Sequence, residues 1–269
     1  MILKEHLKET AVLALPISLG QLGHIMLGVI DNIMIGKVGY APLAAASLVN
    51  GLFFLIIAFG LGMTFASTPL IAIAKGEGNY KKCGTILTNS VMVNFLFSFL
   101  LIAVMYSLSY LIPYLNQPKE VVEEAIPYLR VLTISIIPFM LFQCYRQFLD
   151  GLSLPKPPMI ISVTANFLNA FLNWVLIFGN LGFEPLGLFG AGIATTITRF
   201  LMAGSIIYFV MNANSLKDYN SKFTLKAKEL QVIKKLLDIG VPTGFQFFLE
   251  VACFAFATVM IGWIGTKQL

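Results

Sequence analysis

Three long stretches without a charged side chain constrain this chain more than any other feature. No Lys, Arg, Asp or Glu occurs in residues 38–74, 83–118 or 157–183. A helix that crosses the hydrocarbon core of a bilayer needs about 20 predominantly apolar residues, and each stretch is long enough to supply one. The composition agrees, because only 12% of residues are charged, about half the share in soluble domains. We therefore expect an all-α, polytopic membrane protein and not a soluble enzyme.

The apolar stretches are typical of helices and not of barrel strands. Strands of a membrane barrel alternate apolar and polar residues over about 10 positions, whereas these stretches are apolar on all sides. Together with shorter apolar segments they predict seven membrane-spanning helices. The predicted spans are residues 10–36, 44–74, 83–112, 125–150, 157–181, 188–212 and 236–264.

The basic residues predict the orientation of the spans. Most of the 18 Lys and Arg residues lie before the first span or in the loops that emerge on the same side as the N-terminus. Because basic residues accumulate in short cytoplasmic loops, we expect a cytoplasmic N-terminus and a multi-pass protein of the inner (plasma) membrane. The loop charges also account for the net charge of +5, so nucleic acid is not an expected partner.

The seventh predicted span repeats the first in ungapped register. Pro16 lies opposite Pro242, and the triplet Met-Ile-Gly at 34–36 lies opposite the same triplet at 260–262. Spans one and seven run in the same direction, so the repeat is parallel, with an axis along the membrane normal. We therefore expect a six-span lobe at 1–212, a basic cytoplasmic linker at 213–235 and the first span of an incomplete second lobe at 236–269. The complete protein would then be about twice the repeat length; a half-size protein that dimerises is the alternative.

Three ionisable side chains fall well inside the predicted spans, namely Asp31, Arg199 and Glu250. Each costs at least a few kcal/mol near the bilayer centre and usually faces a bundle interior or a wet cavity. The two carboxylates are suited to exchanging a proton or Na⁺ for a cationic solute. Arg199 is expected to be structural, pairing with a carboxylate or extending its charged end towards the interface.

Weaker polar signals accompany the two carboxylates. Asn169 and Asn173 are four residues apart and share one helix face, where they either bond a neighbouring helix or line a polar cavity. His24 lies two turns before Asp31 and at the repeat position of Glu250. Further candidates for lining the cavity or forming a hinge are Pro16, His24 and Thr196.

Other polar and small residues of the spans have structural interpretations. Asn166 belongs to the same group of amides as Asn169 and Asn173. The hydroxyls of Thr195, Thr196 and Thr198 are expected to bond back to their own helix. Gly190 and Gly192 predict close helix packing.

Catalytic and cofactor chemistry has no support in the sequence. The pattern of a phosphate-binding loop is absent, and Cys83, Cys144 and Cys253 have neither metal-binding nor redox spacing. We therefore expect no enzyme, no cofactor and no structural metal, with Na⁺ or H⁺ as a transported coupling ion.

Four stretches, in chain order, resemble the MATE (multidrug and toxic compound extrusion) family. They are Leu15-Pro16 with Val29-Ile30-Asp31-Asn32-Ile33-Met34-Ile35-Gly36, then Asn169-Ala170-Phe171-Leu172-Asn173-Trp174, then Gly190-Ala191-Gly192-Ile193-Ala194-Thr195, and finally Gly240-Val241-Pro242 with Phe248-Leu249-Glu250. The resemblance implies two six-helix lobes in a V, alternating access, and efflux driven by inward Na⁺ or H⁺.

The resemblance also implies a role for individual residues. Asp31 matches the first-span carboxylate that binds the coupling ion, and Asn169 and Asn173 match the fifth-span pair that completes this site. Glu250 matches a seventh-span acid of the sodium-driven branch, and Pro16 the proline at which the first helix bends. The expected partners are small lipophilic cationic solutes, the lipid bilayer and the second lobe. The alternatives are a lipid-linked oligosaccharide flippase of the same superfamily and a non-transporting truncated product.

Overall fold

The computed structural model describes the backbone of residues 2–219 and 229–264, and the side chains of 14–23, 25–219 and 229–254. Along these residues the chain forms helices and no strand. The long helices are α1 (Ile2–Gly36), α2 (Tyr40–Phe65), α3 (Ser67–Gly76), α4 (Tyr80–Ser109), α5 (Lys119–Ile134), α6 (Ile136–Gly151), α7 (Lys156–Leu176), α8 (Gly187–Asn212) and α9 (Leu230–Ile264). Short 3₁₀ turns η1 (Ile112–Leu115), η2 (Asn180–Gly182) and η3 (Asn214–Tyr219) lie in the connections.

The predicted spans agree with these helices. Six segments of the described chain are long and apolar enough to cross a membrane, and α5 with α6 makes a seventh if the bent pair, with an angle of 42°, is one broken span. One difference is at α9, which begins at Leu230, within the predicted linker 213–235. The first helix likewise begins at Ile2, well before the predicted start at residue 10.

Two spans are broken at positions that a proline explains. The second span is interrupted at Ala66, between α2 and α3, and the fourth at Ser135, between α5 and α6. In each case a proline follows three residues later, Pro69 and Pro138. A proline has no backbone N–H and is tolerated in the first turn of a helix, where the N–H groups lack intrahelical partners. The proline therefore favours a new helix start at these two points.

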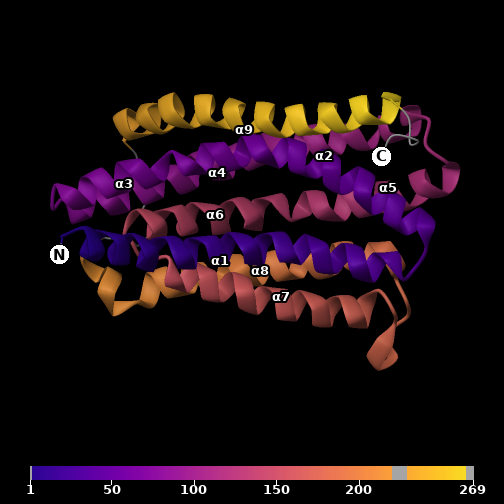
Figure 1. Cartoon of the computed structure of the whole chain (residues 1–269), viewed down its shortest axis with the longest axis horizontal. Helices are drawn as coiled ribbons and strands as arrows, with labels where there is room; N and C mark the ends of the chain where they lie inside the picture. The colour runs from indigo at the N-terminus through magenta and orange to yellow at the C-terminus, as the bar shows by residue number, and fades with distance from the viewer. Residues whose placement is uncertain (1, 220–228, 265–269) are drawn as a thin grey trace.

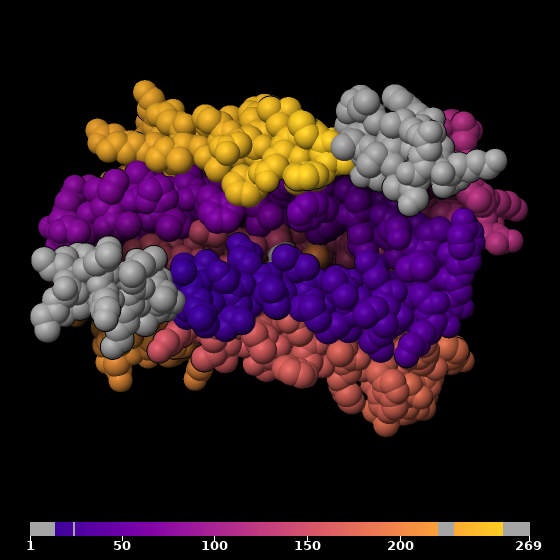
Figure 2. Space-filling view, viewed as in Figure 1, coloured from indigo at the N-terminus to yellow at the C-terminus, as the bar shows by residue number. Residues whose placement is uncertain are grey.

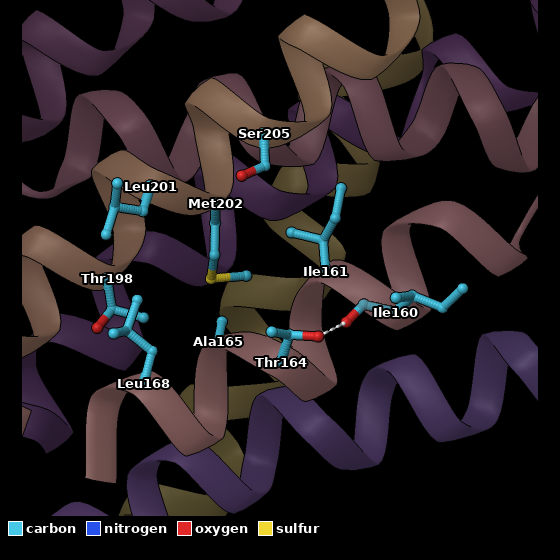
Figure 3. Close-up of a pocket in the computed structure, with 9 residues that line it drawn as sticks. All are labelled: Ile160, Ile161, Thr164, Ala165, Leu168, Thr198, Leu201, Met202 and Ser205. Carbon is cyan, nitrogen blue, oxygen red and sulfur yellow. Dashed lines mark hydrogen bonds between the residues drawn. The ribbon is translucent and has the colours of Figure 1, made fainter. Parts of the chain in front are cut away.

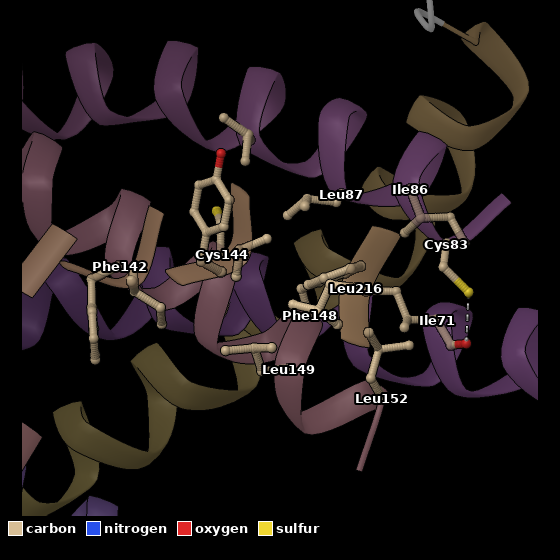
Figure 4. Packing of buried hydrophobic residues seen from close by; sticks show 14 of the residues in the cluster. Ile71, Cys83, Ile86, Leu87, Phe142, Cys144, Phe148, Leu149, Leu152 and Leu216 are labelled. Atoms are coloured by element: carbon tan, nitrogen blue, oxygen red, sulfur yellow. Dashed lines mark hydrogen bonds between the residues drawn. The ribbon is translucent and has the colours of Figure 1, made fainter. Parts of the chain in front are cut away.

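The helices run side by side along the long axis of the molecule (Figure 1). α9 packs along α2 at one edge, while α1 packs on α7 and α7 on α8. The buried apolar side chains form two clusters at opposite ends of the bundle. Figure 4 shows part of one cluster, in which Phe148 and Leu149 of α6, together with Leu152 just after it, lie near Ile71 of α3. Many large apolar side chains remain exposed on the outside, as expected for a surface that faces lipid.

The glycines of α8 permit the close approach that the sequence predicted. A Cβ built at Gly190 would lie 2.6 Å from the backbone oxygen of Leu176 on α7, and one at Gly192 would lie 3.1 Å from the Tyr128 ring. Both glycines are buried. The contact between α7 and α8 brings two faces with polar side chains together, as described below.

We expect Gly190→Ala to destabilise the folded protein by about 1–3 kcal/mol, because the added methyl group overlaps a backbone atom that cannot move alone. Thermal unfolding of the purified protein in detergent measures the change. Gly204→Ala on the same helix is the matched control, since a Cβ there meets no atom within 4 Å. Equal melting temperatures for the two variants would contradict the packing argument.

Candidate functional site

A buried carboxylate, Asp31, lies at the centre of the candidate site. Its residue is only 4% exposed and lies in the last turns of α1. Asn173 Nδ2 of α7 donates to Asp31 Oδ1 at 2.5 Å, and Thr195 Oγ1 of α8 donates to Asp31 Oδ2 at 3.0 Å. Both carboxylate oxygens are therefore held by neutral donors from two other helices, which is how a buried acid avoids the full penalty of losing its water.

A row of amides on α7 extends the site. Asn169 and Asn173 are both fully buried, and Asn173 Nδ2 also donates to Asn169 Oδ1 at 3.2 Å. Asn166, one turn earlier, donates instead to the backbone oxygen of Gly23 on α1 at 2.8 Å. The two possibilities that the sequence left open thus apply to different residues: Asn166 joins two helices, while Asn169 and Asn173 belong to the polar cluster around Asp31.

The carboxylate opens onto a cavity of about 360 Å³. Its walls come from α1, α2, α5, α6 and α8, and Figure 2 shows the recess between α1 and α2 on this face. Apart from Asp31 and Thr195, the lining is mostly aromatic and aliphatic. The lining includes Asn50, Phe53, Phe54, Tyr128, Phe139 and Arg199.

Arg199 lies one turn beyond Thr195 on α8 and lines the same cavity. Its Nη1 donates to Ser135 Oγ at 2.6 Å, at the break between α5 and α6. The guanidinium carbon lies 4.7 Å from the centre of the Phe53 ring and 5.1 Å from that of Phe139. Arg199 forms no ion pair among the described residues, so of the two structural roles expected for it, pairing with a carboxylate is not the one that these contacts show.

Glu250 is the one predicted member of the site that does not join the others. It is exposed on α9, which packs along α2, and it is not among the residues that line the cavity. The structure therefore brings together three of the four predicted residues, Asp31, Asn169 and Asn173. Within this chain Glu250 lies on a separate surface.

The threonines of α8 behave differently from the prediction. Thr195 donates to Asp31, and Thr196 Oγ1 donates to the backbone oxygen of Val131 on α5 at 3.2 Å. Both therefore bond neighbouring helices and not their own, because α8 is packed closely on both sides. Thr195 was missed as a site residue, and the available signal was its position one helical turn before Arg199.

A buried charge pair in α6 was also missed. Arg146 Nε lies 3.7 Å from Asp150 Oδ2, and both side chains are largely buried in α6. Arg146 lies close to the end of its predicted span, 125–150, and its burial was not predicted. The oppositely charged residue one turn later allows the pair to remain inside the bundle.

The remaining predicted candidates have less to do with the polar cluster. Pro16 is buried inside α1, which continues through it as one helix. The side chain of His24 lies outside the described residues. Thr196 takes no part in lining the cavity.

A smaller cavity between α7 and α8 has no comparable chemistry. It measures about 180 Å³ and its lining, drawn in Figure 3, is mostly aliphatic. The hydroxyl of Thr164 donates to the backbone oxygen of Ile160, so it is already satisfied. We therefore assign the functional site to the cavity at Asp31.

The amino-acid sequence is similar to a known family of proteins. The sequence model of the family described as MatE matches residues 16–175. The multidrug resistance protein NorM of Photobacterium profundum is 29% identical over 259 residues, covering 96% of this chain and 57% of the relative. The probable multidrug resistance protein NorM of Pasteurella multocida is 31% identical over 265 residues, covering 98% and 57%. The chain thus spans rather more than half the length of these curated relatives.

Solved structures show the same fold. The crystal structure of the eukaryotic MATE transporter AtDTX14 matches with a TM-score of 0.83 at 20% identity, over 99% of this chain and 58% of that one. The bent form of the Vibrio cholerae MATE transporter VcmN matches with a TM-score of 0.82 at 23% identity, over 96% and 57%.

Proposed function

Since this chain belongs to the MatE family, we propose that it supplies the first lobe, 1–212, the linker, 213–235, and the first helix of the second lobe, 236–269, of a two-lobe antiporter. The antiporter expels small lipophilic cationic solutes in exchange for Na⁺ or H⁺. The names of the NorM relatives support multidrug export. The observation that carries the proposal is the buried Asp31 carboxylate, which neutral donors hold at the edge of a cavity.

Asp31 is the group that the coupling cation visits in this proposal. A carboxylate in low dielectric is stabilised strongly by any cation that reaches it, so the empty and occupied states differ widely in energy. A ligand shifts a conformational equilibrium only through such a difference in affinity for the two states. Binding at Asp31 therefore biases the lobes towards one orientation, and solute export accompanies the return.

The chemistry of the site suits either cation. A proton binds directly to a carboxylate oxygen. Na⁺ favours oxygen ligands, and the cluster offers the oxygens of Asp31, Thr195 Oγ1 and Asn173 Oδ1, the last of which is buried without a donor among the described residues. Glu250 serves as a second acid on the face of α9 that the second lobe approaches.

The proposal further places the protein in the inner membrane with the N-terminus in the cytoplasm. Four lysines lie at helix ends on one side of the bundle. Lys75 is in the last turn of α3 and Lys82 in the first turn of α4, while Lys156 begins α7 and Lys235 lies in the first turns of α9. Basic residues gather on the cytoplasmic side of membrane proteins.

Dye efflux from proteoliposomes tests the function. With the protein produced from its complete reading frame, we expect ethidium export to accelerate when an inward Na⁺ or H⁺ gradient is imposed, and to stop when the gradient is collapsed. A sodium jump without effect beside an effective pH jump assigns H⁺, and the reverse assigns Na⁺. Efflux indifferent to both gradients would contradict a coupled antiporter.

A further inference from the structure

The cavity at Asp31 also holds a fixed positive charge that the coupling reaction does not use. Arg199 donates a single hydrogen bond, from Nη1 to the Ser135 hydroxyl. A guanidinium has five N–H donors in one plane, so the other four have no acceptor among the described residues. Donors of this kind, left at the wall of a cavity, are suited to a ligand that brings its own acceptors.

The environment of Arg199 fixes the direction in which a ligand can approach. The guanidinium carbon lies over the faces of Phe53 and Phe139, at 4.7 Å and 5.1 Å from the ring centres. Rings stacked on a guanidinium leave its in-plane N–H groups available. The Ser135 hydroxyl, which itself donates to the Leu132 backbone oxygen at 2.6 Å, holds one edge of the plane. The cation is therefore oriented before any ligand arrives.

Asp31 does not neutralise this cation by contact. Its two oxygens accept hydrogen bonds from Asn173 and Thr195, and no ion pair joins it to Arg199 in the part of the chain described. The cavity thus carries one negative and one positive charge at separate places on its wall. A molecule with both a cationic and an anionic group matches this distribution better than a simple cation.

The remaining lining matches an aromatic body. Phe53, Phe54, Tyr128 and Phe139 contribute rings to the wall. The volume of about 360 Å³ is at the lower end of the range for sites that take drug-sized ligands. Arg pairs with carboxylates through two parallel hydrogen bonds, which is the strongest arrangement for this donor group.

We propose that Arg199 anchors the carboxylate of aromatic solutes, so that the transporter prefers zwitterionic aromatic molecules to the corresponding cations. This inference rests on the proposed export function and narrows its substrate class. In it Arg199 is a binding and specificity residue, Phe53 and Phe139 hold the guanidinium in place, and Ser135 orients it.

A pair of dyes that differ only at the acid tests the proposal. Rhodamine B carries a free carboxylate, and its ethyl ester carries the same aromatic cation without that charge. We expect the purified protein in nanodiscs to bind the acid about tenfold more tightly than the ester by fluorescence anisotropy, because only the free carboxylate can accept the paired, charge-assisted hydrogen bonds of the guanidinium. Tighter binding of the ester by the unaltered protein would overturn the proposal without any variant.

Variants at Arg199 then assign the preference. In Arg199→Gln the ratio of acid to ester affinity is expected to fall by about tenfold. Arg199→Lys keeps the charge but not the planar fork, so its ratio is expected to lie between those of the unaltered protein and Arg199→Gln. Arg130→Gln is the matched control, because Arg130 is exposed and lies over Tyr106 away from the cavity. An unchanged ratio in Arg199→Gln would overturn the assignment, and circular dichroism with size-exclusion chromatography shows whether each variant is folded.

The two proposals fail separately. Gradient-driven efflux of ethidium, which has no carboxylate, reports on the antiport function alone. If ethidium is exported but the acid is not preferred, the role of Arg199 is wrong and the function stands. If the acid is preferred but ethidium is not exported with either gradient, the cavity binds zwitterions and the antiport proposal is wrong.

Discussion

Asp31→Asn is expected to reduce gradient-driven dye efflux to the level of vesicles without protein. The substitution keeps the size of the side chain and removes the charge, so that neither a proton nor Na⁺ is stabilised there. The amide can keep both contacts, because its Oδ1 accepts from Asn173 Nδ2 and its Nδ2 donates to Thr195 Oγ1, a hydroxyl that accepts as well as donates. The measurement is the initial rate of ethidium export from proteoliposomes under an imposed Na⁺ or H⁺ gradient.

Two further variants separate loss of the charge from loss of structure. Asp238→Asn removes a carboxylate that is exposed on α9 and is expected to leave efflux unchanged. Thr195→Val removes one donor to Asp31 and is expected to weaken coupling less than Asp31→Asn, with Thr195→Ser restoring it. Efflux at the unaltered rate in Asp31→Asn would exclude Asp31 as the coupling site.

Gly62→Leu is expected to separate α9 from α2. A Cβ at Gly62 would overlap the backbone of Gly244 on α9, at the point where the two helices cross, and a Cβ at Gly244 would lie 2.9 Å from the Phe59 backbone oxygen. Both glycines are buried. Because backbone cannot yield as a flexible side chain does, we expect a cost at or above the roughly 1–3 kcal/mol of ordinary overpacking.

Chemical cross-linking across the same interface measures this separation. Phe65 of α2 and Phe247 of α9 stack with ring centres 5.2 Å apart, so cysteines at these two positions face each other and are expected to be joined by a short bis-maleimide reagent. The yield is expected to fall about tenfold when Gly62 becomes Leu, if the cost exceeds about 1.4 kcal/mol. Gly51→Leu is the control on α2, since a Cβ at Gly51 meets nothing within 4 Å; an equal loss in both variants would contradict a specific crossing.

The family and the membrane fold were predicted correctly from the sequence, and the reason is that both depend on order along the chain. A span is recognised by a continuous apolar run, and α8 (Gly187–Asn212) lies within one residue of its predicted start. The starts of α1 and α9 were placed less well. Their first turns carry Lys or Glu residues, which a hydropathy criterion excludes although a helix continues readily through them into the interface.

The candidate site could be predicted only in part. Asp31 was identifiable because an acid inside an apolar run is costly wherever it lies, and Asn169 and Asn173 because a spacing of four residues puts them on one face. Thr195 was predicted to bond back to its own helix, since the backbone of a membrane helix usually supplies the partner of a threonine, and its position one turn before Arg199 was not used. The prediction for Glu250 as a member of the same site stays a prediction; in this chain the residue is exposed on α9 and does not line the cavity.

The sequence alone therefore determined that the chain is built of helices apolar and long enough to cross a bilayer, and that one of them carries an acid that must find partners in the bundle. Only the tertiary structure decided which partners those are, because they come from positions 142 and 164 residues away along the chain. It also decided that Arg199 contacts two rings and a hydroxyl and not the carboxylate that shares its cavity. The physical reason is that burial is a property of a segment, whereas the direction of a hydrogen bond depends on how three packed helices are rotated against one another.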